Sequence, residues 1–131
     1  AMHQPSTARL LKADQVRGGC AETAASPISE LNNEVIKFTT EYKKRFATAP
    51  DAFALAQYDG MNMVIAALKS GAKTAIEVRN WLATNTFKGL AMSYKSDGKG
   101  NMAHDATIVC YDGKTRIPKI IKRYLNVDGV F

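Results

Sequence analysis

The sequence predicts an α/β domain in which about three helices are followed by a C-terminal antiparallel hairpin and strands. Three observations lead to this prediction. Apolar residues recur at the helical period between residues 29 and 83, and the period changes to two after residue 89. Asp-Gly pairs at 97–98 and 112–113 then mark turns between strands. A chain of 131 residues has the size of one domain with one core.

The first predicted elements are a short strand and a surface helix. Residues 16–24 look like a strand that runs into a loop, because Ser26 precedes Pro27 and a residue before proline avoids the helical region. A helix should follow from about Ser29 to Ala47. Its apolar stripe has spacings of four, three, four and four, and consists of Leu31, Val35, Phe38, Tyr42 and Phe46. The opposite face is charged, with spacings that allow ion pairs between Glu34, Lys37 and Glu41.

The second predicted helix begins at Pro50 and Asp51, ends at Gly71 and carries very little charge. Aspartate suits a helix start because its carboxylate accepts hydrogen bonds from first-turn N–H groups. Apolar residues cover more than one side, so we expect the helix to be packed on most of its circumference. Gly60 costs about 1 kcal/mol relative to alanine, which indicates either tight contact with another element or simple tolerance.

A third, short helix is predicted from Ala75 to about Ala83, because Thr74 and Glu77 match a capping box. Beyond it, the segments "LAMSY", "MAHDATIVCY" and "RIPKIIKRYLNV" have the period of strands. Pro118 places the last strand at a sheet edge or splits it.

The formal charge of +6 is unevenly distributed. Residues 66–131 hold 11 of the 18 basic residues and 5 of the 12 acidic ones. A basic cluster near the C-terminus could bind nucleic acid, and consists of Lys114, Arg116, Lys119, Lys122 and Arg123. Since no stacking aromatics are interleaved with these cations, a solvated face is the favoured interpretation.

Motifs for metal binding are absent from the sequence. Cys20 and Cys110 have no zinc spacing, and His3 and His104 are too isolated to add ligands. Cys110 lies in the apolar run "TIVCY" and is expected to behave as a small buried hydrophobe, with a reactive thiol or a disulfide to Cys20 as alternatives. We therefore predict no metal site.

Motifs for catalysis are absent as well. The segment "SDGKG" lacks the order of a phosphate-binding loop and the carboxylates of a calcium loop, so it is interpreted as a turn. His104 and Asp105 have no nucleophile placed near them, so an edge-strand histidine is favoured over a catalytic one. The sequence predicts a protein that is not an enzyme and needs no cofactor. No apolar run reaches the roughly 20 residues of a membrane span, and "AMHQPSTARLL" does not read as a signal peptide.

One resemblance covers about residues 16–115. The segments "VIKFTTEYKKRFATAPDAFALAQYDGMNMVIAALKSG" and "VRNWLATNTFKGLAMSYKSDGKG" resemble the C-terminal part of type I periplasmic binding proteins, the branched-chain amino acid receptors of ABC importers. The matching signals are the aromatic stripe, Pro50, the pair Tyr58-Asp59, then Phe87, Gly89 and the Asp97-Gly98 turn. One departure is Met92, where the family usually has a glycine.

The resemblance implies a division of the chain. Residues 1–28 would be the end of the second lobe and the hinge, residues 29–100 the helical part of the first lobe, and residues 101–131 the C-terminal strands returning across the hinge. The family packs the uncharged helix against a sheet from the N-terminal half. We therefore expect the C-terminal hairpin or a second copy to cover this helix here, and predict a homodimer or higher homo-oligomer.

The resemblance also implies a function. It is capture of a small solute, an amino acid or a related aromatic or aliphatic carboxylate, in the periplasm, followed by delivery to a membrane permease. Phe53, Leu55 and Tyr58 match the positions near the cleft and would make apolar or aromatic ligand contacts, with an ordinary core role as the alternative for all three. Because the groups that grip the carboxylate lie in the part that is not present, binding by this chain alone should be weak or absent. The alternative function is a self-associating or partner-binding module without ligand binding, and a small nucleic-acid binder is the least favoured.

Overall fold

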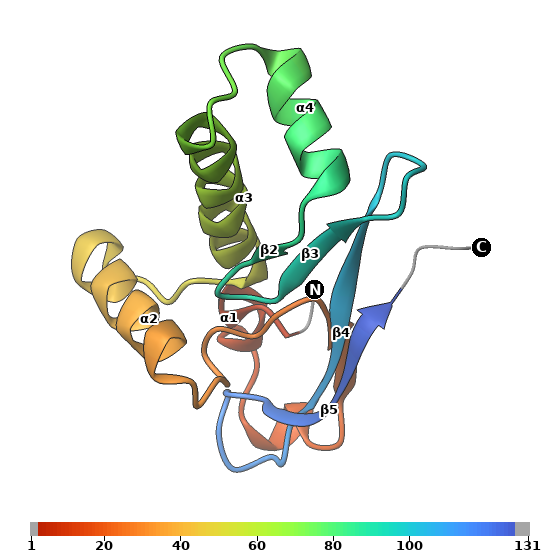
Figure 1. Ribbon diagram of the computed structural model, residues 1–131. Helices are drawn as coiled ribbons and strands as arrows, with labels where there is room; N and C mark the ends of the chain where they lie inside the picture. Colours follow the sequence, from red (N-terminus) through yellow and green to blue (C-terminus); the bar gives the residue numbers. More distant parts are fainter. Residues whose placement is uncertain (1–2, 128–131) are drawn as a thin grey trace.

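The computed structural model describes residues 3–127 and has a mixed α/β fold with one antiparallel sheet (Figure 1). This confirms the predicted fold class. The elements in chain order are α1 (Pro5–Ala8), the 3-10 helix η1 (Asp14–Val16), β1 (Cys20–Thr23), α2 (Asn33–Phe46), α3 (Ala52–Lys69), α4 (Ala75–Thr84), β2 (Phe87–Lys88), β3 (Ser93–Ser96), β4 (Met102–Cys110) and β5 (Lys119–Val127). Within residues 3–127, no helix has both the length and the apolar character of a membrane span.

Strand β4 organises the sheet, because it pairs with three others. Its first residues pair with β3, residues 107–110 pair with β1, and residues 104–110 pair with β5, all antiparallel. The Asp97-Gly98 turn joins β3 to β4 as predicted: the Asp97 carboxylate accepts hydrogen bonds from the backbone N–H groups of Lys99 and Asn101. Strand β5 begins directly after Pro118 and pairs with β4 alone among the described strands, which agrees with an edge position.

Two helix starts, at Asp51 and Thr74, follow the predicted capping chemistry, and a cap at Asn32 was not predicted. Asn32 accepts a hydrogen bond from the backbone N–H of Glu34, and Asp51 accepts one from Ala54 at 2.8 Å. Thr74 and Glu77 form the complete capping box of α4. Helix α2 begins four residues later than predicted, because the Ser29 backbone N–H is bonded to Ser26 in a turn.

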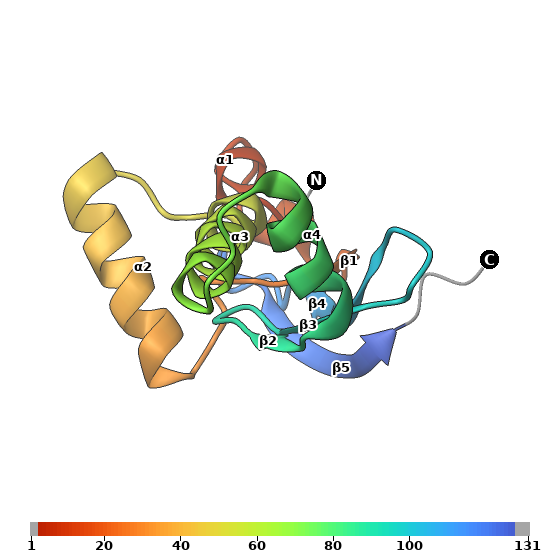
Figure 2. The ribbon, with the colours of Figure 1, turned by 45° about the horizontal axis from the view of Figure 1, so that its top comes forward.

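The three long helices lie side by side, with α3 between α2 and α4 (Figures 1 and 2). One core cluster joins α2 and α3 to the loop after β1 and the loop before β3, and consists of Ala25, Val35, Leu55, Ala91 and Met92. A second, smaller cluster joins α1 and η1 to the end of β4, and consists of Ala8, Val16 and Tyr111.

The prediction that α3 is packed on most of its circumference is wrong for the residues that the structure describes. Leu55, Asp59 and Ala67 are its buried residues, whereas many of its large apolar side chains are exposed. The C-terminal hairpin does not cover this helix, since β4 and β5 lie away from it (Figure 1). At Gly60, an added Cβ would meet no described atom within 4 Å outside its chain neighbours and the nearby backbone of α3, so tolerance rather than tight contact describes this position.

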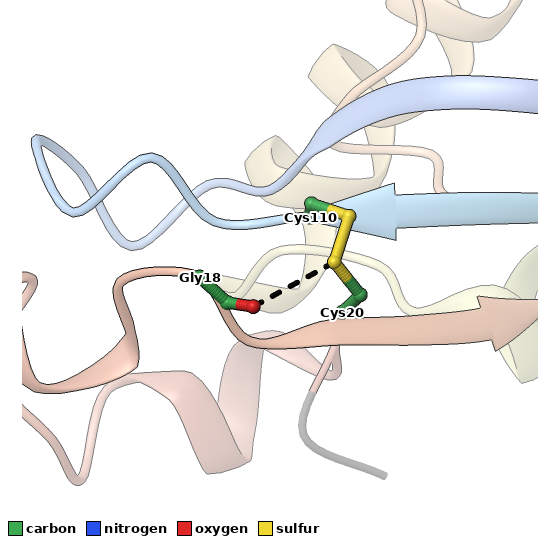
Figure 3. The surroundings of a disulfide bond; sticks show 3 residues. All are labelled: Gly18, Cys20 and Cys110. Atoms are coloured by element: carbon green, nitrogen blue, oxygen red, sulfur yellow. Dashed lines mark hydrogen bonds between the residues drawn. A yellow bond between two sulfur atoms is a disulfide. The ribbon is translucent and has the colours of Figure 1, made fainter.

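The expectation that Cys110 is a free, buried hydrophobe is also wrong. Cys20 and Cys110 are joined by a disulfide (Figure 3). The reason is register: the antiparallel pairing of β1 and β4 puts these two residues directly opposite each other, although they are separated by 90 positions in sequence.

The division at residues 28 and 100 stays a prediction. Strand β1 from the first part shares a sheet with β4 and β5 from the last part, and α2, α3 and α4 all lie in the middle part.

Candidate functional site

A groove of about 670 Å³ lies between α2 and α3 and is lined by aromatic side chains. Phe38, Tyr42 and Phe46 contribute from α2, and Tyr58 contributes from α3. The ring centroids of Phe38 and Tyr58 are 5.0 Å apart, and those of Tyr42 and Phe46 are 4.6 Å apart. These separations fall in the range of attractive ring contacts. The aromatic groove therefore offers flat apolar surface from two helices.

The sequence explains why these rings meet. Phe38, Tyr42 and Phe46 follow each other at intervals of four, which places them on one face of α2. Buried Pro50 and the Asp51 cap fix the start of α3, so Tyr58 comes two turns later on the side facing α2. The aromatic stripe is thus only partly a core feature: Phe38 packs against the core, while Phe46 remains largely exposed.

The rim of the aromatic groove is polar. Glu34, Lys37, Glu41 and Arg45 of α2 line it, together with Gln57 of α3. Neither of the two ion pairs among residues 3–127 involves these side chains, so the spacing that permits ion pairs on α2 is not used for them. Two cations, Lys37 and Arg45, therefore stand next to an aromatic surface without an acidic partner in salt-bridge distance.

The three residues predicted from the sequence lie in different environments. Tyr58 is 45 % exposed and lines the aromatic groove. Phe53 is 70 % exposed in the first turn of α3. Leu55 is fully buried in the core cluster with Val35 and Met92. The structure therefore brings Tyr58 into the groove, leaves Phe53 exposed beside the start of α3, and uses Leu55 for packing.

Asp59 is the residue of this region whose contacts the sequence did not reveal. It is 1 % exposed, and its carboxylate accepts hydrogen bonds from the backbone N–H groups of Leu90 and Ala91, both at 2.8 Å, and from the Tyr94 hydroxyl at 3.1 Å. Burial, and then the nearby negative charge of Asp59, raise the pKa of Tyr94 well above its usual range. These bonds attach α3 to the loop between β2 and β3 and to β3 itself, in which Tyr94 lies.

Gly89 makes this attachment possible. A Cβ added there would lie 2.3 Å from Oδ2 of Asp59 and 2.8 Å from Cε2 of Tyr94, so no other residue fits without displacement. Met92, found where the resemblance leads one to expect glycine, is buried in the core, and its carbonyl accepts a hydrogen bond from the Gly89 N–H at 2.8 Å. The spacing of Asp59 and Gly89 was visible in the sequence, but their contact depends on tertiary structure.

Some other polar groups of residues 3–127 have structural partners, whereas the buried Nδ1 of His3 and Oε1 of Gln4 have no hydrogen-bond partner there. No group of three or more His, Cys, Asp or Glu side chains within residues 3–127 is placed to hold a metal ion. Nδ1 of His104 lies 3.0 Å from the Asp105 carbonyl oxygen, and the Asp105 carboxylate accepts a hydrogen bond from the Asn126 N–H. In the basic cluster, Lys119 pairs with Asp112, and Lys122 stands over the ring of Tyr124.

The sequence matches no protein-family model and no curated protein. Solved structures do match its fold. A branched-chain amino acid ABC transporter periplasmic ligand-binding protein from Burkholderia xenovorans superposes with a TM-score of 0.81 at 12% identity, over 92% of this chain and 34% of that one. A solute-binding protein of an ABC transporter from Rhodopseudomonas palustris, in complex with 3,4-dihydroxybenzoic acid, gives a TM-score of 0.73 at 18% identity, over 88% of this chain and 33% of that one.

This chain has the fold of part of a type I periplasmic binding protein. A branched-chain amino acid binding protein from Streptococcus pneumoniae, in complex with isoleucine, gives a TM-score of 0.65 at 23% identity, over 88% of this chain and 34% of that one. The chain spans about a third of the length of these binding proteins. At these identities, the likeness establishes the periplasmic-binding-protein fold, as the resemblance in sequence predicted.

Proposed function

We propose that this chain is the C-terminal part of the solute-binding component of an ABC importer for amino acids or related small carboxylates, and that it captures its ligand without catalysis. The observation that carries the proposal is the aromatic groove, with Lys37 and Arg45 on its rim, in a chain with a periplasmic-binding-protein fold. Aromatic walls with a few placed charges suit a flat or branched apolar body that ends in a carboxylate.

In this proposal the three predicted residues have separate roles. Tyr58 stacks on the apolar body of the solute. Phe53 lies outside the lining of the aromatic groove, and its contact with the solute stays the prediction made from the resemblance. Leu55 holds both of them by anchoring α3 in the core. One wall of a site gives little affinity, because the remaining contacts come from other parts of a binding protein. Binding by this chain alone should therefore be weak, with a dissociation constant in the millimolar range.

The proposal is tested by titrating the isotope-labelled chain with benzoate, isoleucine and neutral benzyl alcohol while its amide resonances are monitored. Benzoate or isoleucine should shift resonances of α2 and α3, and benzyl alcohol should bind more weakly because it lacks the carboxylate. Tyr58→Ala should weaken binding about fivefold or more. Tyr124→Ala is the matched control, since Tyr124 is 46 % exposed and lies on β5 away from the aromatic groove.

Two results would count against this function. The first is equal binding by the Tyr58→Ala and Tyr124→Ala variants, which would mean that the groove is not used. The second is the absence of shifts in α2 and α3 up to about 50 mM of either carboxylate, since even a one-sided site should be half occupied there.

The partners follow from the same proposal. A solute-binding component works in the periplasm and delivers its ligand to a membrane permease. Nucleic acid is not proposed as a partner, because Arg123 and Lys119 of the basic cluster already pair with Glu30 and Asp112.

A self-associating module is the second candidate function, favoured by the uncovered face of α3. Phe53, Met61, Val64 and Leu68 recur at helical spacings and form this outer face, with Met61 62 % and Leu68 50 % exposed. A contiguous apolar face of this kind commonly marks a contact between proteins. Sedimentation velocity should then show a homodimer that Met61→Glu dissociates, with Leu125→Glu on β5 as the control. A monomer at about 100 µM, a concentration far above ordinary dimer dissociation constants, would exclude this candidate.

A further inference from the structure

A second pocket, of about 340 Å³, lies on the side of α2 that faces away from the aromatic groove. The residues of α2 that line it are Ile36, Thr39, Thr40 and Lys43, which alternate along the helix with those that line the aromatic groove. The two sites have no lining residue in common. Whatever binds in the second pocket is therefore separate from the proposed solute.

Three cations from three separate segments line this pocket. Arg9 follows α1, Lys43 belongs to α2, and Arg116 comes from the loop between β4 and β5. None of them takes part in either ion pair of residues 3–127. Glu30 is the acidic residue that lines the pocket in this part of the chain, and its carboxylate is already paired with Arg123. The pocket therefore carries uncompensated positive charge.

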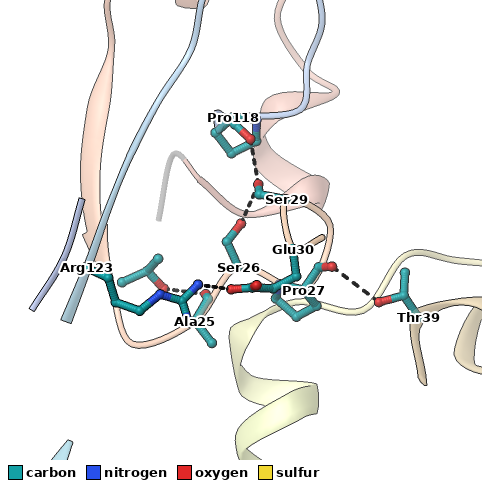
Figure 4. Close-up of polar contacts among 9 residues, drawn as sticks. Ala25, Ser26, Pro27, Ser29, Glu30, Thr39, Pro118 and Arg123 are labelled. Carbon is teal, nitrogen blue, oxygen red and sulfur yellow. Dashed lines mark hydrogen bonds and ion pairs between the residues drawn. The ribbon is translucent and has the colours of Figure 1, made fainter. Parts of the chain in front are cut away.

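The walls of the pocket are held together by hydrogen bonds (Figure 4). The Ser29 hydroxyl donates to the Pro118 carbonyl at 2.6 Å, which ties the β4–β5 loop to the segment before α2. The Thr39 hydroxyl donates to the Pro27 carbonyl at 3.4 Å, which ties α2 to the same segment. The ion pair of Glu30 and Arg123 connects this segment to β5. The segments that carry Lys43 and Arg116 are thus fixed relative to each other before any ligand arrives.

We propose that this basic pocket binds a small organic anion that carries two or more negative charges on a short apolar body. Arginine forks match the oxygens of carboxylates and phosphates, so Arg9 and Arg116 hold the charged groups and Lys43 adds a third cation. The rest of the lining is largely apolar and includes Pro5, Ile36 and Ile117, which suits the body of such a ligand. Phosphate monoesters and dicarboxylates share this chemistry.

The test is a titration of the whole chain at constant ionic strength with phenyl phosphate, inorganic phosphate and succinate. Calorimetry gives the affinities, and the amide resonances of Thr39 and Thr40 locate the site. Phenyl phosphate should bind more tightly than inorganic phosphate, because it also uses the apolar wall. Whether phenyl phosphate or succinate binds more tightly then identifies the preferred charged group.

Matched variants separate the pocket from general charge attraction. Arg9→Gln and Arg116→Gln should each weaken binding about tenfold, since each removes charge-assisted hydrogen bonds. Lys95→Gln removes the same charge from β3, outside the basic pocket, and should leave binding unchanged. Arg116→Lys keeps the charge but loses the fork, and should give intermediate affinity. Both arginines are exposed, so the variants should keep the native circular dichroism spectrum.

The proposal is overturned if no dianion, at concentrations up to about 20 mM, shifts the amide resonances of Thr39 or Thr40, because this range covers weak binding to a single pocket. It is also overturned if Lys95→Gln weakens binding as much as Arg116→Gln does. Failure here would leave the proposed solute function untouched, because Tyr58→Ala alters the aromatic groove and should not change the affinity of the basic pocket.

Discussion

Replacing Asp59 should destabilise the chain more than any other change on α3 outside the apolar core. Its carboxylate is the shared acceptor for two backbone N–H groups, those of Leu90 and Ala91, and for the Tyr94 hydroxyl. Asp59→Ala removes all three hydrogen bonds and leaves a cavity where the carboxylate was. The backbone N–H groups of Leu90 and Ala91 then lose their acceptor at positions where water has little access.

The expected magnitude follows from these contacts. A hydrogen bond to a charged group contributes about 1.5–3 kcal/mol, and an unpaired buried donor costs about 1–3 kcal/mol. Because the three bonds share one acceptor and removal of the charge also relieves its desolvation, they do not add fully. We expect Asp59→Ala to lower the free energy of unfolding by about 3–5 kcal/mol. Asp59→Asn keeps one acceptor oxygen but turns an NH₂ group toward a donor, so it should lower the free energy of unfolding by about 2 kcal/mol.

Urea denaturation followed by circular dichroism measures these changes, with Asp14→Ala as the control for an exposed carboxylate. The geometry at Gly89 adds a sharper test. Gly89→Ala places its Cβ against Asp59. The loss of unfolding free energy that it causes should therefore be smaller in the Asp59→Ala background than in the native chain. Strict additivity of the two substitutions, or a loss below about 1 kcal/mol for Asp59→Ala, would refute this account of the attachment.

Three further predictions concern the disulfide, a tyrosine and a glycine. Replacing both Cys20 and Cys110 with alanine should lower the free energy of unfolding by about 4–5 kcal/mol in the chain-entropy account, because the bond closes a loop of 90 positions; equal melting temperatures for the native and doubly substituted chains would contradict this. The raised pKa of Tyr94 means that the native state holds this proton more tightly than the unfolded chain does, so the stabilisation is complete below pH 10 and is lost as the pH rises above it. Absorbance at alkaline pH should show the Tyr94 phenol ionising last, and Tyr94→Phe should flatten the alkaline loss of stability. Gly60→Ala should raise the stability of the isolated chain by about 0.5–1 kcal/mol in thermal melts, because the position is helical and the added methyl group meets no described atom; a loss of stability would show that the site is in close contact after all.

The helices were predictable because their signals are local. Asp51 and Thr74 cap helices through residues three positions away, so a short stretch of sequence contains both partners. Tyr42 and Phe46 meet for the same reason, since an interval of four on a helix brings side chains together. Helix α2 begins later than predicted because Ser29 belongs to a turn with Ser26, and the Ser29 hydroxyl also donates to the Pro118 carbonyl, 89 positions away.

The contacts that were missed all depend on distant segments. Cys20 and Cys110 pair because of the register between β1 and β4. The sequence around either cysteine does not determine that register. Asp59 bonds with residues 31 to 35 positions later, which only the packing of α3 against the β2–β3 loop determines. The basic pocket draws on Arg9, Lys43 and Arg116, whose common location no spacing in the sequence indicates.

The mismatch between the sequence of α3 and its burial is itself informative. A helix with this composition lowers the free energy of folding by removing apolar surface from water, yet Met61 and Leu68 stay exposed in residues 3–127. Gly60 lies next to Met61, and outside its chain neighbours and the backbone of α3 no described atom lies within 4 Å of the place of a Cβ there. The chain spans about a third of the length of the binding proteins that share its fold, and cover of this face by a second copy of the chain stays a proposal. Gly60→Ala distinguishes a face that is free from one that is closely covered, since the same methyl group that stabilises a free helix would push a close neighbour away.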